Sequence, residues 1–185
     1  MLCSKQSLLK YLVSYSQSRK HIKINFFYSK TGSDNKMTTL DNVYRKFGQA
    51  SEAAQLLEVE LVNVCLDYGF KSGQCVDDMR KEFDLIDRFT LEKLIKRLKS
   101  LGVINEENCV LIEKAKEARN DLSHNFYRRH GFRRLSEEGC QIMLENLEEL
   151  HWKIFEGYRH VLLLSNIDIP RLSDSHEEYK RFENQ

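Results

Sequence analysis

The chain has 185 residues, of which 41% are hydrophobic and 31% charged, with one proline and a formal net charge of +1. This length fits one domain with its own hydrophobic core, and the composition favours helices over a sandwich or barrel, which needs many tight turns. No apolar run approaches the roughly 18 residues of a membrane span. The five separated cysteines have no disulfide or zinc spacing. We therefore expect a cytoplasmic protein without a membrane span, a metal site or a cofactor.

The first 36 residues are basic, with seven lysine or arginine residues against one aspartate. They close on Thr-Gly-Ser-Asp-Asn-Lys, a linker composition, just before Met37. Two interpretations stay open: a flexible arm that touches nucleic acid or anionic lipid, or a poorly ordered extension with Met37 as the functional start. The expected organisation is a basic extension over 1–36, a helical bundle domain over 37–170 and a polar C-terminal tail over 171–185.

Apolar residues at steps of three and four predict a long helix from Leu40 to Gly69 and a weaker one over 76–83. Thr90 is expected to cap a helix that ends at Gly102, and Asn105 is expected to cap a helix that ends near residue 124. Ser136 is expected to cap a last long helix. Four main helices and one short helix, each with one apolar stripe, indicate an all-α bundle. We expect Val110, Ile142 and Trp152 to face its core.

One segment of this chain combines side chains suited to acid–base chemistry, namely Arg-Asn-Asp-Leu-Ser-His at 119–124. A neutral imidazole, here His124, can take a proton from a ribose 2′-hydroxyl and return one to a leaving 5′-oxygen, and the Arg119 guanidinium can stabilise the phosphate between them. Asn120, Asp121 and Ser123 add polar groups. Such RNA cleavage needs no metal.

Helix geometry separates the two central residues of this segment. Residues five apart on an ideal α-helix point about 140° apart and lie roughly 7.5 Å apart along the axis. For Arg119 and His124 to act on one phosphate, either the helix must loosen near His124 or two chains must bring their motifs together at a dimer axis. We favour the dimer.

The helical context and this motif resemble the HEPN superfamily, whose hallmark is an arginine, a polar residue, a few variable residues and a histidine toward a helix end. Arg119, Asn120 and His124 match those positions. The resemblance implies a HEPN-like bundle and a metal-independent endoribonuclease site at a homodimer interface, often in toxin–antitoxin or phage-defence systems, with a cognate antitoxin as partner. In one toxin branch a tyrosine lies two residues after the histidine; here that position is Phe126, which puts regulation by tyrosine modification in doubt.

A basic and aromatic segment follows the motif. Its candidate RNA-binding residues are Tyr127, Arg128, Arg129, His130, Arg133 and Arg134. The arginines could bind phosphates while the aromatic rings stack on bases. An equally open interpretation is a solvated connection that offsets the acidic helix after it.

Two functions therefore remain. The first is a homodimeric endoribonuclease that uses Arg119, Asn120 and His124. The second is a non-catalytic helical module that binds a protein partner, such as a regulatory protein, or itself acts as a regulator, as the looser similarity to the mannitol-operon repressor family implies. Glu148 and His151 have the spacing of di-iron bundles, but no second copy of that pair is present, so we expect no metal centre.

Overall fold

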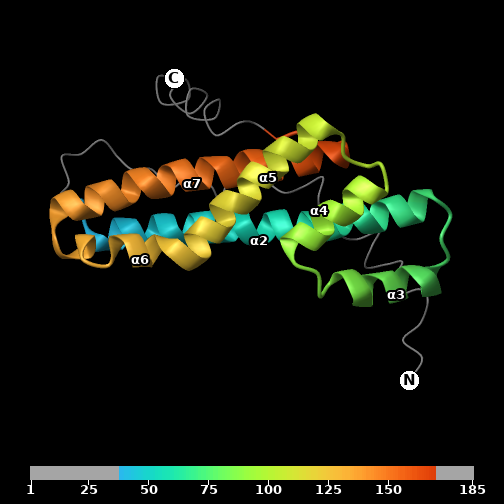
Figure 1. The fold of residues 1–185 in the computed structure, drawn as a ribbon, viewed down its shortest axis with the longest axis horizontal. Coiled ribbons are helices and arrows are strands. Elements are labelled where there is room, and N and C mark those ends of the chain that lie inside the picture. The colour runs from blue at the N-terminus through green and yellow to red at the C-terminus, as the bar shows by residue number, and fades with distance from the viewer. Residues whose placement is uncertain (1–37, 170–185) are drawn as a thin grey trace, which may run out of the picture.

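The computed structural model describes residues 38–169, which are helical apart from short connections (Figure 1). The α-helices are α2 (Leu40–Lys71), α3 (Val76–Ile86), α4 (Leu91–Ser100), α5 (Glu106–Asn120), α6 (Phe126–His130) and α7 (Glu137–Leu164). A π-helical turn (Asp121–Asn125) joins α5 to α6, and a 3₁₀ turn (Arg133–Leu135) precedes α7. The predicted all-α fold is confirmed. The assignments made for 1–36 and 171–185 lie outside the described residues.

Helices α2 and α7 lie side by side along the length of the bundle and run in the same direction (Figure 1). Helices α5 and α6 run in the opposite direction and pack against this pair, while α4 and α3 cover the C-terminal half of α2. Each long helix reverses the direction of the one before it, as short connections require. None of the helices within 38–169 combines the length and apolarity needed to cross a bilayer.

The predicted capping residues begin their helices as expected. The Thr90 hydroxyl accepts a hydrogen bond from the Lys93 backbone N–H at 3.4 Å, the Asn105 side chain accepts one from Asn108 at 2.8 Å, and Ser136 accepts one from Gly139 at 3.1 Å. Each cap satisfies a backbone donor that the first helical turn leaves unpaired. Polar residues in the sequence therefore define where α4, α5 and α7 start.

The apolar side chains form two clusters along the bundle. One lies where the second half of α2 meets α3, α4, the start of α5 and the end of α7. The other lies where the first half of α2 meets the end of α5, the π-helical turn, α6 and the start of α7. Ala118, Leu122 and Phe126 belong to the second cluster, so the helix that carries the candidate motif is anchored from one side.

Three residues expected in the core are instead exposed: Val110, Ile142 and Trp152. On α5 the buried residues are Cys109, Ile112, Ala115 and Ala118, at steps of three. Val110 follows Cys109 by one position, and one residue turns a helix by about 100°, so its side chain lies beside the buried stripe. Apolar character alone did not identify the inward face.

Helices α5 and α7 approach each other closely at Gly157. A Cβ atom added to Gly157 would lie 2.3 Å from the Cβ of Ala115. The missing side chain lets the two helices pack backbone to backbone at this level. Arg119 is one turn beyond Ala115, so this crossing helps to fix the end of α5 that carries the motif.

Candidate functional site

The candidate motif begins near a helix end, as predicted, because Arg119 and Asn120 are the last two residues of α5, and the chain stays helical beyond them to residue 130. The α-helical pattern gives way to a π-helical turn at Asp121–Asn125, where the Phe126 backbone N–H donates to the carbonyl of Asp121. Arg128, Arg129 and His130, expected in a connection, are helical. The helix thus widens at His124.

The spacing of buried residues explains the π-helical turn. Ala118, Leu122, Phe126 and His130 are buried at successive steps of four. In a regular α-helix each step of four rotates the side chain by about 40°, so three steps would turn His130 about 120° away from the core. A wider turn absorbs this rotation and keeps Phe126 packed on Phe47, with ring centroids 5.7 Å apart.

Arg119 is held by contacts from two helices. Its Nη2 lies 2.6 Å from Oε1 of Glu58 on α2, and its Nη1 donates to the Asn120 side-chain oxygen at 3.1 Å. Glu58, Arg119 and Asn120 all line an open cavity of about 480 Å³, together with Lys116 and residues 87–92. The guanidinium is therefore oriented and has access to a ligand in this cavity.

His124 and Arg119 do not share this cavity. The His124 side chain is exposed on the π-helical turn, but it is not among the residues that line the cavity beside Arg119. Asn120, predicted to act with them, lies on the Arg119 side. Within one chain the structure joins Arg119 to Asn120 and leaves His124 facing solvent.

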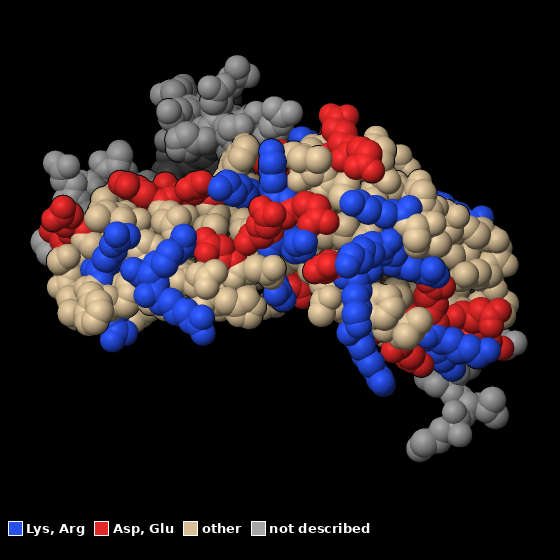
Figure 2. Space-filling model, viewed as in Figure 1, with Lys and Arg blue, Asp and Glu red and all other residues tan. Residues whose placement is uncertain are grey.

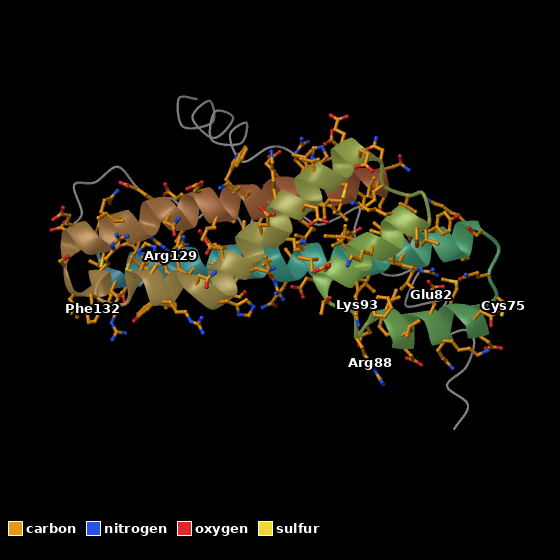
Figure 3. All side chains as sticks on the ribbon, in the orientation of Figure 1. Cys75, Glu82, Arg88, Lys93, Arg129 and Phe132 are labelled. Carbon is orange, nitrogen blue, oxygen red and sulfur yellow. The ribbon has the colours of Figure 1, made fainter. Side chains whose placement is uncertain are left out.

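The arginines of the basic segment are exposed, and Arg129 also makes contacts within the bundle. Arg129 contacts Asp121 and donates to Asn146 of α7 at 3.4 Å, so it lies between α6 and α7 (Figure 3). Arg128 and Arg134 are exposed, and Tyr127 is partly exposed beside Phe47. Figure 2 shows Lys and Arg side chains gathered over α6 and again over α4, with acidic side chains between them.

His130 differs from the other candidate RNA-binding residues because it is buried, with 3% of its surface exposed. Its Nε2 is 3.1 Å from the Asn146 side-chain oxygen, and its Nδ1 is 3.1 Å from an Arg133 nitrogen. Burial lowers the pKa of His130, which favours the neutral ring that these two partners require. His130 therefore bridges Arg133 and Asn146 of α7, and RNA binding by this residue stays a prediction.

Besides His130, the bundle contains a second buried histidine, His151, with ionisable side chains near it. Burial, and then the charge of Lys46, lower the pKa of His151 to about 4. The pKa of Lys46 is itself lowered by burial, against the opposing charge of Glu148. In the described part of the chain, no three His, Cys, Asp or Glu side chains are close enough together to hold a metal ion. Of the Glu148 and His151 pair, only His151 is buried, whereas Glu148 is exposed on the same helix.

Glu58 and Phe47 are the residues near the motif that the sequence did not identify. Both lie on α2, more than 60 positions before the residues that they contact. No local spacing relates them to the motif, so only the packing of α2 against α5 and α6 could have revealed them.

Comparisons of the chain with protein-family models, with curated proteins and with solved structures gave no match.

Proposed function

We propose that this chain forms a homodimeric, metal-independent endoribonuclease of the HEPN type. The observation that carries the proposal is the π-helical turn at Asp121–Asn125, which follows Arg119 and Asn120 directly and presents His124 to solvent. Single π-helical turns inside α-helices are rare and occur frequently at functional sites. Here the turn separates a held guanidinium from an exposed imidazole, the two groups that the chemistry needs.

The reaction follows from these two groups. The ribose 2′-oxygen attacks the adjacent phosphorus while His124 accepts its proton, and the bond from phosphorus to the 5′-oxygen breaks as that oxygen takes a proton from the imidazolium. Arg119 stabilises the negative charge on the phosphate oxygens in the transition state. The products end in a 2′,3′-cyclic phosphate and a 5′-hydroxyl. The step needs no metal ion and consumes no water.

We propose that each active site pairs Arg119 of one chain with His124 of the other. Within a chain, Arg119 faces a cavity that His124 does not line. A two-fold axis near the π-helical turn would bring each exposed imidazole to the guanidinium of the second copy. The exposed Arg128 and Arg134 would bind flanking phosphates, with Tyr127 beside them for stacking on a base.

The test is cleavage of RNA by the purified full chain in excess EDTA. The proposal predicts products that end in a 2′,3′-cyclic phosphate and a loss of at least about a hundredfold in rate for His124→Ala, since general acid–base catalysis contributes about that much or more. The matched control is His160→Gln, which removes an imidazole from α7 outside the motif. Full activity of the His124→Ala chain would refute the assignment.

A non-catalytic module that binds a protein partner or acts as a regulator is the second candidate. It is favoured by the exposed apolar side chains of the connection before α7, which include Phe132 (Figure 3). Phe132 is 92% exposed and Leu135 is 78% exposed. Contiguous exposed apolar patches are typical of protein interfaces. If this candidate is correct, the chain cleaves no RNA, and the Phe132→Ser, Leu135→Ser double variant loses a partner that the wild-type chain retains in a pull-down.

A further inference from the structure

We propose that Glu58 is the positioning residue for Arg119, and that it also competes with the substrate phosphate for that guanidinium. This inference rests on the proposed function, because it takes an RNA phosphate as the ligand of Arg119. It adds a residue from α2, a helix that carries no part of the motif.

The geometry of the ion pair supports the positioning role. Glu58 Oε1 and Arg119 Nη2 are 2.6 Å apart, and the two side chains are only 37% and 29% exposed. The second contact, from Nη1 to Asn120, fixes the other end of the planar guanidinium. With both Nη atoms held, the remaining N–H groups have a set direction, and the cavity that all three residues line is open to a ligand.

The same contact supports the competition. The Glu58 carboxylate lines the cavity that a phosphate must enter to reach Arg119. A phosphate oxygen and a carboxylate oxygen carry like charges and seek the same donors. Glu58 therefore weakens binding of the phosphate to the same extent in the bound substrate and in the transition state, so its charge raises KM without changing kcat.

Two substitutions separate the roles. Glu58→Gln keeps an oxygen that accepts from Arg119 but removes the charge, so it should lower KM by about fivefold to tenfold and change kcat by less than about twofold. Glu58→Ala removes the acceptor as well and should lower kcat by about tenfold. Glu52→Gln, on the same helix, is the matched control and should change neither constant.

Binding provides a readout that does not need cleavage. In the His124→Ala background, fluorescence anisotropy with a labelled, 2′-O-methylated oligonucleotide of mixed sequence should show about fivefold to tenfold tighter binding for Glu58→Gln. Adding Arg119→Ala should reduce that gain to less than about twofold, because the two residues act on the phosphate as a pair. Thermal unfolding by circular dichroism checks that every variant is folded.

The outcomes separate this inference from the proposed function. If the chain cleaves RNA but KM and kcat are the same for Glu58→Gln, Glu58→Ala and Glu52→Gln, the inference is overturned and the proposed nuclease activity stands. If the wild-type chain cleaves no RNA but Glu58→Gln still tightens oligonucleotide binding in a way that depends on Arg119, the Glu58 contact is supported and the nuclease is rejected. A gain in affinity that survives Arg119→Ala shows general charge repulsion and also overturns the inference.

Discussion

Replacing Gly157 by alanine tests the close crossing of α5 and α7 that supports the motif. The added Cβ would lie 2.3 Å from the Cβ of Ala115, whereas carbon atoms in contact are about 3.5–4.0 Å apart. The two backbones must therefore separate by about 1 Å or more. Such overpacking costs about 1–3 kcal/mol, against a gain of about 1 kcal/mol for removing a glycine from a helix. We expect Gly157→Ala to lower the free energy of unfolding by about 1 kcal/mol, and by at most about 2.

Gly48 on α2 provides the matched control, because a Cβ atom added there meets nothing within 4 Å. Gly48→Ala should raise the free energy of unfolding by about 0.5–1 kcal/mol. Urea unfolding followed by far-UV circular dichroism measures both variants. If Gly157→Ala is stabilised as much as Gly48→Ala, the helices are not in contact at this level and the account of the crossing is wrong.

Two further predictions concern the second apolar cluster and the buried histidine. Phe126→Ala should lower the free energy of unfolding by about 3–5 kcal/mol, because the fully buried ring leaves a large cavity; a loss below about 1 kcal/mol in urea unfolding would contradict this packing. Since the folded pKa of His151 is about 4, below the ordinary 6.5, the unfolded chain binds its proton first, and stability should fall as pH drops from 6.5 to about 4. His151→Leu should reduce that slope by up to about 1.4 kcal/mol per pH unit, and an unchanged slope would refute the assignment.

Local chemistry explains which parts of the fold could be predicted from the sequence. A helix start is decided by a side chain that bonds to a backbone N–H within three residues, so Thr90, Asn105 and Ser136 were sufficient to place three helices. The starts of α2 and α3 also follow the prediction, although α3 extends three residues beyond Phe83. All-α architecture follows from these local rules.

The geometry of the candidate site depends on packing and could not be predicted in the same way. The π-helical turn exists because four buried positions recur at steps of four, which is visible only once the inward face is known. Val110 and Trp152 show that apolar residues do not define that face by themselves. The contact of Glu58 with Arg119 depends on how α2 lies against α5, so no short motif contains it.

The central claim is that Arg119 of one chain acts with His124 of its partner. The direct test is a mixed dimer, purified through two different tags after co-expression, in which one chain carries Arg119→Ala and the other His124→Ala. One of the two composite sites is then intact, so we predict RNA cleavage at about half the wild-type rate, although each variant alone is inactive. A mixed dimer as inactive as the two parent variants would show that the residues act within one chain or not at all.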